Sequence, residues 1–377
     1  MQVRRMCRMA LRLWMGLILI LGLSCHFYSK TRRRLVHSRL LQTFCCLTIA
    51  VNLGLYYFYY VYTASYFVKG TFRRQKFVEV LSNADGLQFL FLVVVPLWRF
   101  FGERKMCEAY NEVSRILDKE LKHKSRSRFY CLTMLVKIHN FLHNFNFALS
   151  VLMVWGFRPL TVSDFLANLY FVYISLSMGA IQVAYVLLLL QLIEALRLNG
   201  RQVQSSYLLL MDQMHRQEHL RQIVRQVHRM FACMVATSLV YDLFFNTGTI
   251  YLGYTMVVQR QDALGIRAWT LKILLTALSF VVKLSGSLLL QVVCAHLLSV
   301  ENKDCASPEI HEQDAEATAA YRQWEMSVLR QAIRRASPED KVLGLFRMDM
   351  RCAFALISSS LSYGTIIIQL GYVHSSN

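Results

Sequence analysis

Seven long apolar runs constrain the fold of this chain more than any other feature of its sequence. They cover residues 40–67, 83–101, 132–156, 163–191, 231–257, 270–297 and 352–372. A run of about 20 apolar residues is long enough to cross a bilayer as a helix. Because lipid offers no partner for backbone N–H and C=O groups, each span must be an α-helix. The sequence therefore predicts an all-α polytopic membrane protein with seven transmembrane helices.

The positive charges predict how these helices are oriented. The formal net charge of +19 could indicate nucleic-acid binding, but the basic residues lie between the apolar runs, where they orient a membrane protein. With the N-terminus inside, the cytoplasmic segments hold 31 Lys and Arg and the outer segments hold 7. This count predicts a cytoplasmic N-terminus, an outer C-terminus and no nucleic-acid partner. The basic cluster KGTFRRQK in the first outer loop is an exception without a physical explanation.

The N-terminal segment, residues 1–39, is predicted to be cytoplasmic. Its apolar run at residues 11–27 has basic clusters on both sides. An interfacial helix would keep both clusters inside, so we favour it over a span. A signal peptide is the alternative, because a basic start and a short apolar core also fit one.

Long breaker-poor segments predict cytoplasmic extensions of the bundle. Residues 192–230 extend the fourth and fifth spans, and residues 298–351 form a helical anchor region. Within the second segment a new helix is expected at Ser337, and it could continue into the last span. The chain thus divides into residues 1–39, the first six spans with a candidate ligand pocket (40–297), the anchor (298–351), and the seventh helix with its outer tail (352–377).

The seventh span carries a row of polar side chains. At 100° per residue, one stripe 80° wide contains Ser358, Ser362, Thr365, Gln369 and Tyr372, while Leu370 lies on the other side of the helix with Tyr363. Such a stripe must face protein or water. Two interpretations remain open from the spacing: hydrogen bonds between packed helices, or the lining of a pore.

Charged residues inside spans provide a second group of candidates. Asp242 and Lys283 lie near mid-depth in the fifth and sixth spans. Because an isolated charge in lipid is costly, we hypothesise an ion pair; the alternative is that either faces a water-filled vestibule alone. Lys137 lies close to the cytoplasmic end of the third span, from which its ammonium group could reach the interface.

Polar and aromatic side chains in the outer half of the membrane suit a small organic ligand. The candidates are Asp164, Asn168, Tyr170 and Tyr173 in the fourth span and Asn246 in the fifth. Aromatic anchoring at the membrane surface explains each tyrosine equally well. No hydrolase, nucleotide-binding or metal-binding motif occurs, so neither an enzyme, nor a cofactor, nor a metal is predicted.

The C-terminal segment GLFRMDMRCAFALISSSLSYGTIIIQL resembles the signature of the insect gustatory receptor family. The matching residues are Gly344, Leu345, Phe346, Asp349, Tyr363 and Gln369. Ser362 stands where the family has Thr, and Leu370 stands where it has Phe. Seven spans, a cytoplasmic N-terminus and long cytoplasmic helices are also similar to the family.

The resemblance implies a ligand-gated cation channel in the cell membrane of a gustatory neuron dendrite. It implies homo- or hetero-tetramers, a pore lined by the seventh span with Gln369 and Leu370 at its gate, and a pocket for a small-molecule tastant of bitter type. A G-protein-coupled-type receptor or a transporter is the alternative. The charge count opposes the first, because such receptors have an outer N-terminus, and no internal repeat supports the second.

Overall fold

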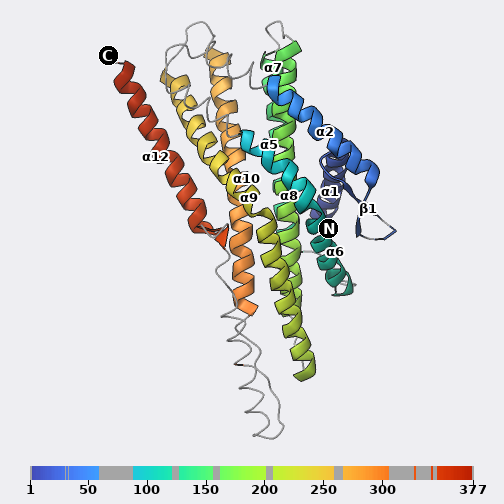
Figure 1. The fold of residues 1–377 in the computed structure, drawn as a ribbon. Helices are drawn as coiled ribbons and strands as arrows, with labels where there is room; N and C mark the ends of the chain where they lie inside the picture. The colour runs from blue at the N-terminus through green and yellow to red at the C-terminus, as the bar shows by residue number, and fades with distance from the viewer. Residues whose placement is uncertain are drawn as a thin grey trace.

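A computed structural model describes residues 2–29, 31–32, 34–58, 88–120, 127–155, 162–200, 207–258, 266–304, 327, 341–342 and 346–375. These residues form long helices gathered into one bundle (Figure 1). The helices are α1 (Gln2–Ile20), α2 (Arg39–Phe58), α5 (Gln88–Leu97), α6 (Glu103–Glu120), α7 (Arg128–Trp155), α8 (Val162–Gly200), α9 (Tyr207–Val258), α10 (Ile266–Asp304) and α12 (Met350–Ser375). A π-helical turn, η3 (Trp98–Gly102), joins α5 to α6.

Each predicted span overlaps a helix. Among the described residues, five helices are long and apolar enough to cross a membrane; they lie in α2, α8, α9, α10 and α12. The second predicted span corresponds to α5 with η3, and the third corresponds to α7. The all-α polytopic fold is therefore confirmed.

Helix α8 forms the centre of the bundle. It contacts α2, α5, α6, α7, α9 and α10, and 83% of its most apolar stretch is buried. Fully buried side chains follow its whole length, including Tyr170, Tyr185, Leu192 and Leu196. Helix α12 lies at the edge of the bundle, against α9 and α10 (Figure 1).

The predicted helical extensions are present in the described residues. α8 continues to Gly200, α9 begins at Tyr207, and α10 continues to Asp304. Residues 305–326 and 328–340, which include the helix start expected at Ser337, lie outside the described part of the chain. The expected continuation into the last span is wrong, because β3 (Lys341–Val342) and β4 (Phe346–Arg347) pair antiparallel just before α12.

The N-terminal helix differs in extent from the predicted one at residues 11–27. It is α1, and it ends at Ile20 because Gly22 turns the chain with a φ of +63°. A Cβ at Gly22 would lie 2.7 Å from Cγ2 of Thr48, so only glycine fits this turn. An antiparallel hairpin follows, β1 (His26–Ser29) with β2 (Arg34–His37). α1 packs on α7 as part of the fold, with Cys7, Trp14 and Ile18 buried.

Candidate pore and ligand-binding sites

The polar stripe of α12 lies on the outside of the subunit. Ser358, Ser362, Thr365 and Gln369 are all exposed. The hydroxyl of Thr365 donates to the carbonyl oxygen of Leu361 at 2.9 Å, so it is satisfied within its own helix. Such back-bonding lets a hydroxyl tolerate an apolar surrounding, but the amide of Gln369 needs a partner from protein or water.

The other face of α12 packs closely on the bundle. Leu356, Ser360 and Gly364 are buried, and Ser360 donates to the carbonyl oxygen of Leu356 at 2.8 Å. A Cβ at Gly364 would lie 2.9 Å from Cγ2 of Ile250 in α9. Close approach of two helices at a small residue is typical of packing in membranes. The helix-packing role therefore belongs to this face, while the predicted polar stripe points away from the subunit.

Large apolar side chains of α12 are also exposed: Leu361 and Ile366 flank the stripe, and Tyr363 and Leu370 lie on the other side of the helix. Tyr363, Leu361, Ile366 and Leu370 are each about half exposed in the single subunit. Among the described residues of its own chain, Tyr363 remains exposed. An exposed surface of this kind beside polar residues marks a site of association or of lipid contact.

Asp349 of the C-terminal motif has a structural role that the sequence pattern did not reveal. Its Oδ1 accepts the backbone N–H groups of Arg351 at 2.9 Å and Cys352 at 3.1 Å, so it caps the N-terminus of α12. Phe346 lies in β4, and Gly344 and Leu345 lie outside the described residues. The motif thus begins the helix that carries the polar stripe.

The two tyrosines among the ligand-pocket candidates face α2 and η3. Tyr170 is fully buried and packs edge-to-face on Tyr56, with ring centroids 5.5 Å apart. The hydroxyl of Tyr173 accepts a hydrogen bond from Arg99 at 3.1 Å, and the guanidinium also lies 6.0 Å from the ring centroid. Asp164 and Asn168 lie in the first turns of α8, and their side chains are outside the described atoms.

On another side of α8, hydrogen-bonded polar groups connect this helix with α7, α9 and α10. The ammonium of Lys137 on α7 donates to Oε1 of Gln182 at 2.9 Å and to the carbonyl oxygen of Gly286 on α10 at 3.1 Å. Gln182 in turn donates to the hydroxyl of Ser238 on α9 at 3.3 Å. Lys137 is only 4% exposed, so the expectation that it reaches the interface is wrong.

Asp242 interacts with this group. It lies one turn after Ser238 on α9, and its carboxylate attracts the Lys137 ammonium across the bundle. The predicted partner, Lys283, has its side chain outside the described atoms, so the Asp242–Lys283 pair stays a prediction. Asn246, one turn beyond Asp242, is buried. Ser238 and Asn246 are thus buried on the same side of α9 as Asp242, and nothing in the sequence indicated that Lys137 would join this buried group.

A second polar cluster fastens the N-terminal hairpin to α6. Oε1 of Glu103 accepts from the hydroxyl of Ser24 at 2.5 Å, the backbone N–H of Cys25 at 2.8 Å and Nδ1 of His26 at 3.1 Å. Burial alone would raise the pKa of Glu103, but these hydrogen bonds together hold its pKa below the ordinary value. Sequence reasoning missed this cluster, because its members are about 80 residues apart and share no motif.

Metal coordination finds no support within the described residues. They contain no cluster of three His, Cys, Asp or Glu side chains that could hold an ion. His139 and His143, one turn apart on α7, have ring centroids 6.4 Å apart.

Three comparisons relate the chain to known proteins. Residues 11–374 match the family model described as 7tm Chemosensory receptor. The chain is 59% identical over 374 residues to "Putative gustatory receptor 10b" of Drosophila melanogaster, which covers 99% of this chain and 100% of that protein. These matches extend over nearly the entire chain, so they include all of the helices described above.

Solved structures show the same fold. The insect olfactory receptor OR5 from Machilis hrabei matches with a TM-score of 0.54 at 14% identity, covering 96% of this chain and 98% of that one. Its complex with eugenol matches with a TM-score of 0.55 at 15% identity, covering 95% and 98%. At this identity the likeness concerns the fold alone.

Proposed function

The chain belongs to the 7tm chemosensory receptor family, among the insect gustatory receptors, and from this premise we propose that it is a tastant-gated cation channel. The relatives are receptors rather than enzymes, and the chain is a multi-pass membrane protein. The finer proposal is that a small-molecule tastant opens a pore in a tetramer of this chain, alone or with other gustatory receptors. A gustatory neuron dendrite is its proposed location.

The exposed stripe of α12 is the observation that carries the proposal. Ser358, Ser362, Thr365 and Gln369 form one row that no described helix of the same subunit covers. A polar row on a membrane helix is stable only against protein or water, and a symmetric ring of subunits supplies both. Four copies of the row around one axis would line a water-filled path. Gln369 and Leu370 lie near its outer end, where an amide and an apolar side chain could form the gate.

The proposed tastant site lies around the ligand-pocket candidates Tyr170 and Tyr173 of α8. Tyr173 with Arg99, and Tyr170 with Tyr56, place aromatic and polar groups together between α8, α2 and η3. This mixture can stack on an organic ligand and orient it by hydrogen bonds. The related olfactory receptor was solved with eugenol, a small aromatic molecule. Bitter-type tastants are proposed as the class, as the resemblance to the gustatory receptors implies.

Current recording tests the channel proposal. The chain is expressed alone and with candidate co-receptors, and whole-cell currents are measured against a tastant panel while G-protein signalling is blocked. A channel gives ligand-evoked currents that survive the block. Currents abolished by the block would favour the G-protein-coupled alternative, and silence in every combination would remove support for a channel.

Cysteine accessibility tests the pore face, and α12 offers a matched control. Ser362→Cys places a thiol on the exposed stripe, whereas Ser360→Cys places the same thiol on the buried face. Native Cys46, Cys233, Cys305 and Cys352 are first replaced by serine. A charged methanethiosulfonate reagent should block currents at Ser362→Cys at least about tenfold faster than at Ser360→Cys, because only the stripe meets water in the open pore. Equal rates would instead assign the stripe to helix packing.

A further inference from the structure

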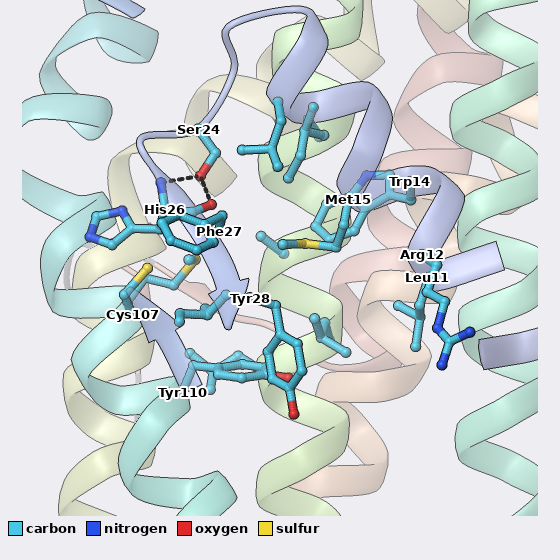
Figure 2. A pocket seen from close by; sticks show the side chains of 18 of the residues that line it. Leu11, Arg12, Trp14, Met15, Ser24, His26, Phe27, Tyr28, Cys107 and Tyr110 are labelled. Atoms are coloured by element: carbon cyan, nitrogen blue, oxygen red, sulfur yellow. Dashed lines mark hydrogen bonds between the residues drawn. The ribbon is translucent and has the colours of Figure 1, made fainter. Parts of the chain in front are cut away.

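A large cavity lies beneath the N-terminal helix, beside the Ser24–His26–Glu103 cluster and apart from the α12 stripe and the candidate tyrosines of α8. Its volume is about 980 Å³, and its walls come from α1, the β1–β2 hairpin, α6, α7 and α8. Cavities of this size hold drug-sized or larger ligands. Figure 2 shows Trp14 and Met15 on α1, with Phe27 and Tyr28 of the hairpin and Tyr110 of α6 among the lining side chains.

The wall of the cavity is mostly apolar, and its mouth is cationic. Leu11, Ile18 and Leu23 line it from the N-terminal segment, and Leu187 and Leu188 line it from α8. Arg4, Arg8 and Arg12 also line it, and all three are exposed. Because they are spaced by four residues on one helix, their guanidinium groups share one side of α1. The combination suits a ligand with a long apolar part and an anionic end.

Open space along α1 extends the apolar part of the cavity. Gly16 lines it, and a Cβ built on Gly16 would have no atom within 4 Å. At the far end, Ser24 and His26 bind the Glu103 carboxylate. Figure 2 shows these two residues on the other side of the cavity from Arg12. The acidic group of the wall is thus separated from the arginine mouth, where an anion would bind.

The location of the cavity points to the membrane as the source of its ligand. Tyr130 and Cys131 line it from the first turn of α7, close to the cytoplasmic end of the third predicted span. On the face of α1 that points away from the cavity, Met6, Met9 and Leu13 are exposed, as expected for a helix in contact with lipid. A basic helix at the cytoplasmic surface attracts the anionic lipids of that leaflet.

We propose that this cavity binds an anionic phospholipid of the cytoplasmic leaflet, with one acyl chain inside it and the phosphate held by Arg4, Arg8 and Arg12. The apolar wall gives the acyl chain surroundings like those it has in the bilayer. The wall alone therefore gives little preference for one headgroup. The three arginines supply the preference, because phosphate forms charge-assisted hydrogen bonds with guanidinium groups. A neutral phospholipid has a compensating positive charge and gains less from them.

Photolabelling of the purified full-length protein tests the proposal. Phosphatidylserine and phosphatidylcholine carry the same diazirine-bearing acyl chain, and labelled peptides are located by mass spectrometry. Phosphatidylserine should label the residues around Gly16 and Leu187, and phosphatidylcholine should label them several-fold less. Equal labelling by the two lipids, or no label in these peptides, would overturn the proposal.

Two matched pairs of variants separate the headgroup from the chain. Arg4→Gln/Arg8→Gln/Arg12→Gln should lower phosphatidylserine labelling by about tenfold or more, whereas Arg5→Gln should leave it unchanged, because Arg5 is exposed but does not line the cavity. Gly16→Leu should fill the chain site and lower labelling. Gly54→Leu, made in equally open space on α2, should have no effect.

The remaining outcomes each decide the proposal. Gel filtration of every variant confirms that it remains folded before labelling is compared. Full labelling of Gly16→Leu would show that the acyl chain lies outside the cavity. Full labelling of the triple arginine variant would show that the arginines do not bind the headgroup. If inorganic phosphate alone displaces the lipid completely, the site recognises only the anion, and the proposed acyl-chain site is wrong.

Discussion

Helices α8 and α12 are both long apolar helices that carry polar residues, yet they differ in how much of their surface the subunit buries. In its most apolar stretch α8 is 83% buried, and α12 is only 22% buried. On α8, the side chain of Gln182 binds within the subunit, to Lys137 and Ser238. The polar side chains of the α12 stripe face outward. One helix thus organises the subunit, while the other has a face whose partners must come from outside it.

The difference in burial distinguishes two kinds of polar residue that look the same in the sequence: those with partners inside the subunit and those exposed on its surface. Both helices satisfy the same length and hydropathy criteria. In α8 the amide of Gln182 helps to specify which helices meet, because its hydrogen bonds join α8 to α7 and α9. In α12 the packing face needs only small residues such as Ser360 and Gly364, so the polar row is free for another role.

Shortening a core leucine should give the largest effect. Leu192 on α8 is 0% exposed and Leu361 on α12 is 54% exposed. Leu192→Ala should lower the free energy of unfolding by about 2–5 kcal/mol, because it leaves a cavity among close-packed helices. Leu361→Ala should lower it by less than about 0.5 kcal/mol in the isolated subunit. Thermal unfolding of the purified variants measures both.

The same pair of variants can show that the exposed face of α12 is packed after all. If Leu361→Ala destabilises the protein as strongly as Leu192→Ala, the outer face of α12 is itself packed in the assembly. Repeating the measurement at protein concentrations that dissociate the oligomer then distinguishes packing between subunits from packing within one.

Enlarging a glycine on the packed face of α12 should have the next largest effect. Gly364→Leu would place a side chain 2.9 Å from Cγ2 of Ile250, and overpacking of this kind costs about 1–3 kcal/mol. Gly54→Leu, in open space on α2, is the control. Unfolding temperature is the readout, and Ile250→Ala should partly rescue Gly364→Leu. Absence of rescue would show that α12 does not rest on α9 at this point.

Removing the buried carboxylate at the N-terminal hairpin should have an intermediate effect that depends on pH. Glu103→Gln should cost about 1–3 kcal/mol near neutral pH, because Ser24 and His26 lose a charged acceptor. The control is Glu108→Gln, which removes an exposed pair with Arg104 worth less than about 1 kcal/mol. Unfolding temperatures of both variants and the parent are compared.

The direction of the pH dependence follows from the lowered pKa of Glu103. A carboxyl group whose pKa is lower in the folded state contributes stability above its unfolded pKa, and this contribution is lost as the pH falls through the folded pKa. The stability difference between parent and Glu103→Gln should therefore shrink below the ordinary pKa of 4.5. A difference that stays constant from pH 7 to pH 3 would contradict the ionised-carboxylate assignment.

The membrane-spanning helices could be predicted from the sequence because each depends on local composition. Apolar runs locate every described span. On α12 the spacing places the buried Leu356 opposite the exposed stripe, but it places Tyr363 and Leu370 there too, and both are about half exposed. The hairpin at His26–His37 was missed, because it is fixed by the turn at Gly22 and by the bonds to Glu103. Those causes act between segments that are distant in sequence.

Side-chain partners were harder to predict than helices for the same reason. Asp242 was assigned to Lys283 by depth alone, and that pair stays a prediction, while the electrostatic attraction between Asp242 and Lys137 was not foreseen. Helix depth fixes one coordinate, but rotation about the helix axis decides which side chains meet. Arg99 shows the same limit: its partner Tyr173 follows from how η3 packs on α8, which no spacing within one segment reveals.

Removing the cap of α12 should have the smallest effect and tests whether the motif aspartate acts locally. Asp349→Ala should lower the free energy of unfolding by about 1 kcal/mol, because the N–H groups of Arg351 and Cys352 lose their acceptor. Asp349→Asn should retain most of the stability, since asparagine is an equally good N-cap. Amide hydrogen exchange at Arg351 and Cys352 should speed up in the alanine variant alone. If Asp349→Asn lowers the free energy of unfolding as much as Asp349→Ala, the charge of Asp349 matters beyond the cap. Asp349 would then belong with the α12 residues whose partners lie outside the subunit.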